Sequence, residues 1–157
     1  MAWQDTDLRE IRSAKNYKEL LLVAIRVLET ITKQHPIKPI AMVCGPISSG
    51  GMNSRDANLF VFSRAINRIS EDGLLIFSQM PFENGMDRIY KSDPKLQGLR
   101  LLEEFYLPIF RSGFIKLLCF LPGWECSIGA SWEHKQAEIL KIPRIDLAES
   151  YVTDWVP

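Results

Sequence analysis

Apolar residues first recur at the spacing of one helix face over residues 16–33. The stripe consists of Tyr17, Leu20, Leu21, Ala24, Val27, Leu28 and Ile31. Asn16 and Glu19 stand three residues apart at its start, which is typical of a capping box at a helix N-terminus. Pro36 and Pro39 follow and interrupt helical structure. The pattern predicts an amphipathic helix over residues 16–33 and a short connector after it.

Beyond the connector, short apolar runs alternate with segments at helical spacing. The runs predict strands over residues 40–44, 74–77, 114–121 and 144–147, and the spacing predicts helices over residues 55–71, 99–109 and 128–140. Pro108 is expected to kink or end the second of these helices. Strands that are apolar on both faces and separated by helices are typical of a parallel sheet with right-handed crossovers. The chain is therefore expected to form a doubly wound α/β domain.

The pattern divides the chain into three parts. Residues 1–36 are expected to be an N-terminal helical extension, residues 37–150 the α/β domain, and residues 151–157 a C-terminal tail. Residues 1–6 and the tail are expected to be loosely held. With 157 residues, of which 46% are hydrophobic, the chain is long enough for about one domain with a proper core.

Charge and cysteine content narrow the function classes. The chain carries 19 Lys and Arg against 19 Asp and Glu, and this balance disfavours a nucleic-acid or anionic-membrane surface. The longest apolar run, residues 20–25, is too short to span a membrane, and the acidic N-terminus disfavours a signal peptide. Three cysteines without metal-type spacing disfavour disulfides and zinc. We therefore expect a soluble, cytoplasmic protein without a metal or cofactor.

Two loops are candidates for chemistry, because ligands of open parallel sheets bind beyond the carboxyl ends of the strands. The first, after residues 40–44, contains Gly45, Pro46, Ile47, Gly50 and Gly51. Glycines there let backbone N–H groups approach an anion, although the loop is neither a dinucleotide fingerprint nor a Walker loop. A phosphate or sugar site and an ordinary tight turn both remain open. A third loop, residues 78–93, is expected at the same edge.

The loop over residues 122–127 leads into the last predicted helix. Ser127 is a good N-cap, and Gly129 leaves the first turn open to a ligand. Helical spacing places Glu133 on a stripe of small apolar residues, where a buried carboxylate needs a functional reason. The stripe facing solvent, or an ion pair with Arg55 or Arg64, are the structural alternatives.

Other candidates are weaker on residue type alone. Trp124 fits stacking on a base, but a Trp is more often packing. Cys44, at a strand end, is more often a buried structural thiol than a nucleophile. Glu83, Asn84 and Asp87 lie in the loop over residues 78–93 and would contact a substrate or solvate the loop.

Together, these motifs resemble the nucleoside 2-deoxyribosyltransferase-like superfamily. The resemblance rests on the strand followed by Cys44-Gly45-Pro46-Ile47, on the L-P-G-W-E turn at residues 121–125, and on S-x-G-A-x-x-E at residues 127–133. The G-x-I-x-x-G-G loop and a Ser six residues before the Glu are also similar to 2′-deoxynucleoside 5′-phosphate N-hydrolases. The resemblance covers roughly residues 40–147.

The resemblance implies a fold and a reaction. The domain would be flavodoxin-like, with four or five parallel strands, and the protein would be a homo-oligomer that binds a nucleoside or nucleotide. Glu133 would be the nucleophile that attacks the anomeric carbon, as in retaining glycosidases. Ser127 and the Gly129 amide would hold a 5′-phosphate or 5′-hydroxyl, and residues 45–51 would line the sugar. Trp124 would also belong to the substrate site.

Two features depart from the family. Active relatives carry an Asp in the helix before the third strand and another where that strand begins, whereas this chain has Glu103-Glu104-Phe105 and Ser112-Gly113. A nucleotide-binding or assembly protein without turnover is therefore the alternative. The helix over residues 16–33 lies outside the common domain, and its apolar stripe favours packing against another subunit over packing on its own sheet.

Overall fold

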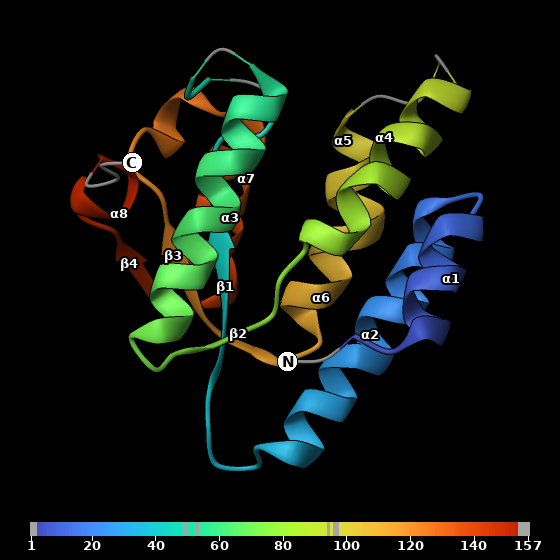
Figure 1. Ribbon diagram of the computed structural model, residues 1–157, viewed down its shortest axis with the longest axis horizontal. Coiled ribbons are helices and arrows are strands. Elements are labelled where there is room, and N and C mark those ends of the chain that lie inside the picture. Colours follow the sequence, from blue (N-terminus) through green and yellow to red (C-terminus); the bar gives the residue numbers. More distant parts are fainter. Residues whose placement is uncertain (1–2, 49, 53, 94, 96–97, 154–157) are drawn as a thin grey trace. The chain divides into compact units, whose positions relative to one another are not determined.

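The chain forms two compact units in a computed structural model (Figure 1) that describes residues 3–48, 50–52, 54–93, 95 and 98–153. The first, here the helical unit, comprises residues 1–38 and 79–114. The second, the sheet unit, comprises residues 39–78 and 115–157. Each unit is built from two separate stretches of the chain.

The sheet unit contains a four-stranded sheet in the order β2-β1-β3-β4. Its strands are β1 (Ile40–Cys44), β2 (Leu75–Ile76), β3 (Ile115–Phe120) and β4 (Arg144–Asp146), and all three pairings are parallel. Every residue of β1 is buried, whereas every residue of the edge strand β4 is exposed. The predicted parallel sheet is confirmed, with shorter edge strands than the apolar runs suggested.

Helices cover both faces of this sheet. They are α3 (Arg55–Glu71), α7 (Ile128–Leu140) and the short α8 (Ser150–Thr153). The chain moves from β1 to β2 in one direction along the sheet and from β3 to β4 in the other. Right-handed crossovers therefore place α3 and α7 on opposite faces, with α3 in front of the strands in Figure 1. The fold is α/β and flavodoxin-like, as predicted.

The helical unit begins with two helices that precede the sheet in sequence. These are α1 (Asp5–Ser13) and α2 (Tyr17–Gln34), and Asn16 caps α2 by accepting the Glu19 N–H at 2.9 Å. The remaining elements of the unit are η1 (Met80–Phe82), α4 (Glu83–Ser92), α5 (Gly98–Leu101), η2 (Leu102–Tyr106) and α6 (Leu107–Arg111).

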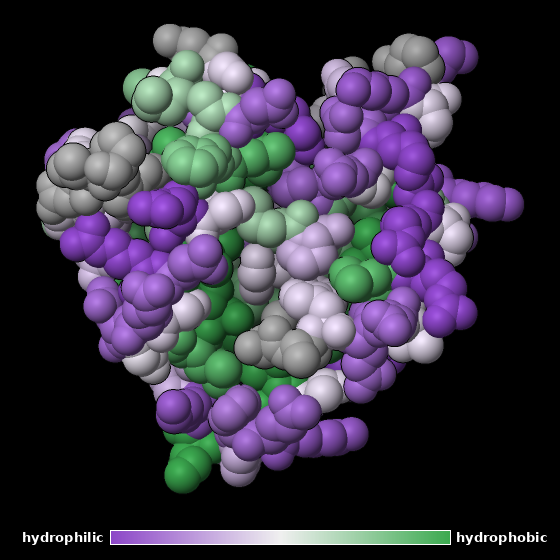
Figure 2. Space-filling model, viewed as in Figure 1, coloured by the Kyte–Doolittle hydropathy of each residue, from purple (hydrophilic) through white to green (hydrophobic). Residues whose placement is uncertain are grey.

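The apolar stripe of α2 is buried within the chain itself. It packs against α1, α4, η2 and α6, while the surface over α1 and α4 is largely hydrophilic (Figure 2). The preference for packing this stripe against another subunit is therefore wrong. The stripe is covered by helices from residues 79–114, which the sequence pattern did not associate with it.

Pro108 neither ends nor interrupts its helical segment. Residues 102–106 form a π-helical turn, in which the Leu107 N–H donates to the Leu102 carbonyl, and α6 continues through Pro108. A π turn shifts the hydrogen-bond register by one residue, which helps a helix to accommodate a residue without an N–H. Pro108 therefore does not end the helix, and the alternative of a kink stays a prediction.

The sequence pattern missed several helices, one of which is α8 at the start of the expected loose tail. Residues 5–13, partly expected to be loose, form α1, and residues 80–92, expected to be a loop beside the ligand, form η1 and α4. The expected boundary between a helical extension (residues 1–36) and an α/β domain (residues 37–150) stays a prediction. Within the described ranges, no helix combines the length and apolarity needed to cross a bilayer.

Candidate functional site

The candidate site lies in the sheet unit, at the carboxyl ends of β1 and β3. These are the two central strands. From β1 the chain continues to β2 at one edge of the sheet, and from β3 it continues to β4 at the opposite edge. Such a reversal of winding direction is where open α/β sheets bind ligands. β1 leads into the glycine loop, residues 45–52, and β3 leads into residues 121–127.

Two consecutive glycines shape the glycine loop. Gly50 has a φ of +72° and Gly51 a φ of +62°, a region that side chains with a Cβ rarely adopt. A Cβ at Gly50 would lie 2.6 Å from the Cys126 carbonyl oxygen, and one at Gly51 would lie 2.4 Å from Asn58 Oδ1. The glycine loop therefore packs directly on the backbone of the loop after β3, and this close approach requires glycine.

Asn58, in the first turns of α3, organises the same loop. Its Oδ1 accepts the Met52 N–H at 2.8 Å, and its Nδ2 donates to the carbonyls of Ile47 at 2.9 Å and Gly50 at 3.1 Å. The side chain is buried. Sequence reasoning did not single out Asn58, although a polar residue on the buried stripe of a helix that follows a glycine loop is a usable signal.

The loop after β3 ends at Ser127, which caps α7. Ser127 is buried, and its Oγ accepts the Ala130 N–H at 3.2 Å. Its hydroxyl proton can still be donated, and Gly129 follows within the first turn. The N-terminus of α7 thus carries partial positive charge close to the glycine loop.

Glu133 lies one turn further along α7. Only 6% of its surface is exposed, so the alternative in which its stripe faces solvent is wrong. Its charge raises the pKa of the thiol of Cys44, the last residue of β1. The structure therefore brings the predicted nucleophile to the end of the central strand.

Cys44 is fully buried and stays protonated. Burial raises the pKa of its thiol well above the ordinary value, and the charge of Glu133 and the neighbouring Cys119 raise it further. A thiol is a nucleophile only as the thiolate. The interpretation of Cys44 as a buried, unreactive thiol is thus favoured.

Trp124 packs on a histidine. Its indole stacks on the His134 imidazole with ring centroids 3.9 Å apart and planes 9° apart, and Phe120 contacts both rings edge-on. Arg144 lies 3.2 Å from His134 Nδ1 and also donates to the His134 carbonyl at 3.2 Å. One face of Trp124 is therefore occupied, which supports its structural interpretation.

The polar candidates from residues 78–93, and Glu104, lie in helices of the helical unit. Glu83, Asn84 and Asp87 belong to α4, where Asp87 pairs with Lys91 at 2.7 Å, and Glu104 pairs with Arg100 at 3.1 Å. The expectation that residues 78–93 form a loop is wrong, because η1 and α4 make residues 80–92 helical.

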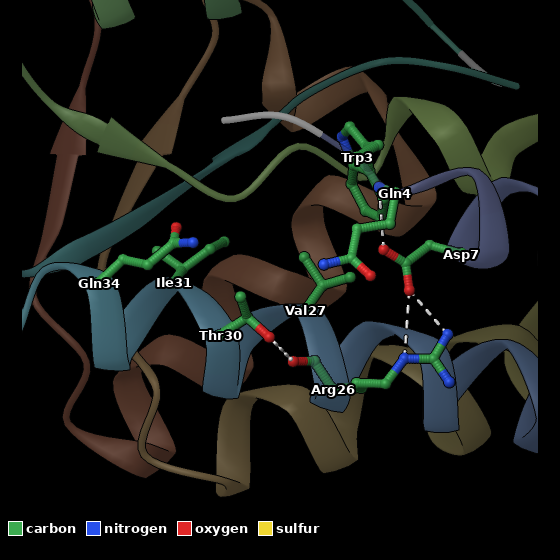
Figure 3. Close-up of a pocket in the computed structure, with 8 residues that line it drawn as sticks. All are labelled: Trp3, Gln4, Asp7, Arg26, Val27, Thr30, Ile31 and Gln34. Atoms are coloured by element: carbon green, nitrogen blue, oxygen red, sulfur yellow. Dashed lines mark hydrogen bonds and ion pairs between the residues drawn. The ribbon is translucent and has the colours of Figure 1, made fainter.

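A cavity of about 80 Å³ lies in the helical unit (Figure 3). It is lined by Trp3, Gln4, Asp7, Arg26, Val27, Thr30, Ile31 and Gln34. Asp7 accepts hydrogen bonds from Arg26 at 2.7 and 3.1 Å, and Glu10 pairs with the same guanidinium at 2.9 Å. Its charged groups thus neutralise one another, as in a structural ion pair between α1 and α2.

Neither a metal site nor a known relative identifies the chemistry of this site. Over the part of the chain that the structure describes, no three His, Cys, Asp or Glu side chains gather to hold a metal ion. The chain matches no protein-family model, no curated protein and no solved structure.

Proposed function

We propose that the protein cleaves the N-glycosidic bond of a nucleoside or nucleotide, with Glu133 as the nucleophile. The observation that carries the proposal is a buried carboxylate near the carboxyl end of the central strand β1, in the second turn of a helix with a capped N-terminus. A carboxylate removed from water is costly to bury, and such groups concentrate where chemistry requires them.

The reaction follows from the properties of a carboxylate. Glu133 attacks the anomeric carbon, the C1′–N bond breaks, and the bonding pair leaves with the base, which takes up a proton. The negative charge stabilises the oxocarbenium-like transition state and then forms a glycosyl ester. Water or a second base attacks C1′, the ester bond breaks towards Glu133, and the carboxylate is regenerated.

The surrounding groups suit a phosphorylated or hydroxylated sugar. The hydroxyl of Ser127 and the amide of Gly129 would hold the 5′ group at the start of α7, where the helix dipole favours an anion. The glycine loop, with Gly45, Pro46, Ile47, Gly50 and Gly51, would line the sugar. These assignments rest on the motif resemblance together with the placement of both loops at one edge of the sheet.

The departing base needs a proton. Glu125 is exposed in η3 (Trp124–Cys126), in the loop between β3 and α7. Glu104, Asp87 and Glu125 are the candidates to replace the family's missing Asp, and of these three Glu125 shares the sheet unit with Glu133. We therefore assign Glu125 as the candidate general acid. We also propose that the protein forms a homo-oligomer, which light scattering would test. We propose further that it is cytoplasmic, which cell fractionation would test.

The test is the variant Glu133→Gln, assayed by chromatography of the free base released from a panel of nucleosides and nucleotides. The amide keeps the shape of the side chain but removes the nucleophile. Base release should fall about a thousandfold or more, while ligand affinity stays within about tenfold. Glu138→Gln is the matched control, because Glu138 lies on the same helix with 73% of its side chain exposed.

Two outcomes would contradict the proposal. Undiminished base release by Glu133→Gln would exclude the nucleophilic role. A wild-type protein that gains thermal stability with a nucleotide but releases no base would favour the alternative of binding without turnover.

A further inference from the structure

Asn58 is a polar side chain on the buried stripe of α3. The other buried residues of this helix are Phe62, Ala65, Ile66 and Ile69. An apolar residue at position 58 would complete this face of the helix without hydrogen bonds, whereas a carboxamide is costly to bury unless its polar atoms are bonded. The amide of Asn58 therefore serves contacts outside the helix and not the packing of α3.

Three hydrogen bonds connect this amide to the glycine loop. The amide oxygen accepts the Met52 N–H at 2.8 Å, and the amide nitrogen donates to the carbonyls of Ile47 at 2.9 Å and Gly50 at 3.1 Å. The helix that carries Asn58 is itself capped by Ser54. The glycine loop is therefore fastened near both of its ends to a capped and packed helix.

The glycine loop in turn lies against the loop that leads to α7. Gly50 approaches the backbone of Cys126 so closely that a Cβ would lie 2.6 Å from the carbonyl oxygen. Cys126 directly precedes Ser127, which is buried and caps α7. A continuous series of contacts thus runs from α3, through the Asn58 amide and the glycine loop, to the start of α7. The position of the loop relative to Ser127 depends on this series.

We propose that Asn58 is a positioning residue for the substrate, which holds the glycine loop at the distance from Ser127 that the sugar and its 5′ group require. This role rests on the proposed function, in which the loop lines the sugar and Ser127 binds the 5′ group, whereas the hydrogen bonds themselves do not. Because Asn58 acts through the loop, it takes part in no bond that forms or breaks. Its loss weakens substrate binding more than the chemical step.

A carboxamide of this length fits the position closely. An ionised carboxylate accepts hydrogen bonds but donates none, so it would lie against two carbonyl oxygens without bonding them, and a hydroxyl donates to one of them at most. A Cβ added at Gly51 would overlap the Asn58 amide oxygen. This leaves no space for the longer side chain of glutamine. The glycine loop and Asn58 are therefore matched in shape as well as in hydrogen bonding.

The first experiment measures the hydrogen bonds in wild-type protein labelled with ¹⁵N-asparagine. Asn67 is the reference, because it lies on the same helix and is exposed. The side-chain N–H protons of Asn58 should exchange with water about a hundredfold or more slower than those of Asn67, because they are buried and bonded. Equal exchange rates would overturn the proposal.

The second experiment adds the common ribonucleoside and 2′-deoxyribonucleoside 5′-monophosphates to the same protein, one at a time. A nucleotide seated between the glycine loop and Ser127 stabilises the loop, so the Asn58 side-chain protons should exchange a further fivefold or so more slowly. A nucleotide that binds by calorimetry without slowing this exchange would contradict the positioning role. Failure of every nucleotide to bind would overturn both the role and the proposed function.

Asn58→Ala and Asn67→Ala are the matched variants for kinetics. Asn58→Ala should raise the KM for base release about tenfold and lower kcat by less than about threefold, since the reacting groups stay in place. Asn67→Ala should keep both constants within about twofold of wild type. A merely structural role would lower the amount of active protein and leave KM unchanged. An unchanged KM in Asn58→Ala, or an equal rise in both variants, would overturn the positioning role.

Binding and base release separate this role from the reaction. If Asn58→Ala weakens nucleotide binding about tenfold while the wild-type protein releases no base, Asn58 positions a ligand and the proposed reaction alone is overturned. If both proteins release base with the same KM, the reaction stands and the positioning role is overturned. If Asn58→Ala does not fold, the two exchange experiments on the wild-type protein decide.

Discussion

Gly51 and Asn58 show how single residues build the glycine loop. The Asn58 amide replaces three backbone partners that the loop lacks, and the loop approaches this amide so closely that a Cβ at Gly51 would lie 2.4 Å from it. The loop geometry therefore depends on the side chain of a buried residue outside the loop.

Gly51→Ala tests this dependence against Gly73→Ala. Both glycines have a positive φ, but a Cβ at Gly73 would meet nothing within 4 Å. Gly73→Ala should cost only the backbone strain, about 1–2 kcal/mol. Gly51→Ala should cost about 2–4 kcal/mol, because overpacking adds to that strain. Urea unfolding followed by circular dichroism measures both, and equal losses would show that the contact with Asn58 is unimportant.

Only some residues of the candidate site could be predicted from the sequence. The sequence placed Glu133 on an apolar stripe and Ser127 at a helix start, because both follow from helical periodicity. The electrostatic influence of Glu133 on Cys44 could not be predicted, since the two residues are about 90 positions apart in the sequence. Neither could the pairing of Trp124 with His134, which depends on the turn geometry of η3.

At the level of elements, the apolar pattern of α2 agrees closely with the burial of its residues. Its stripe is buried and its opposite face is exposed, so two leucines on one helix have opposite surroundings. Leu20 has 0% of its surface exposed and Leu22 has 70%. The stability of the helical unit should therefore depend on one and not on the other.

Leu20→Ala and Leu22→Ala form a matched pair. Leu20→Ala should cost about 2–5 kcal/mol, from lost burial and the cavity left behind. Leu22→Ala should change the free energy of unfolding by no more than about 0.5 kcal/mol. Urea or thermal unfolding compares them. A large loss in Leu22→Ala would mean that the exposed face of α2 is covered by another molecule in solution.

The accuracy of the element predictions followed the strength of each pattern. The extents of α3 and α7 agree with the prediction, because each has a capping Ser and an apolar stripe. Both α1 and α4 are mostly polar, and their few apolar residues give no stripe long enough to recognise. The continuation of the helix through Pro108 could not be predicted, because the π turn before it has no recognised sequence signal.

At the scale of the whole molecule, the chain passes between its two units three times. Residues 79–114, which connect β2 to β3, form one compact unit with the N-terminal helices. The sequence pattern predicted the strands in their succession along the chain. It did not predict this grouping, because the contacts between α2 and η2 join residues about 80 positions apart.

Deletion of residues 1–38 tests the grouping. Without α1 and α2, the remaining helices expose the apolar faces of Phe82, Phe105 and Ile109, which are buried in the intact protein. The truncated protein should therefore be cleaved rapidly within residues 79–114 by a nonspecific protease, or be insoluble. Limited proteolysis with mass spectrometry compares it with the full chain. A soluble truncated protein that resists cleavage there would refute the grouping.

The distance along the chain between β1 and β3 also matters during synthesis. β1 is entirely apolar, and its main partner β3 follows roughly 70 residues later. At about 5–20 residues per second, the ribosome needs roughly 4–14 s to supply that partner. During this interval the nascent chain presents an unpaired, uncharged segment, Ile40–Cys44, with β2 offering only a two-residue pairing. Newly made protein is thus exposed to chaperone capture or misassembly at the strand that later supports the candidate nucleophile.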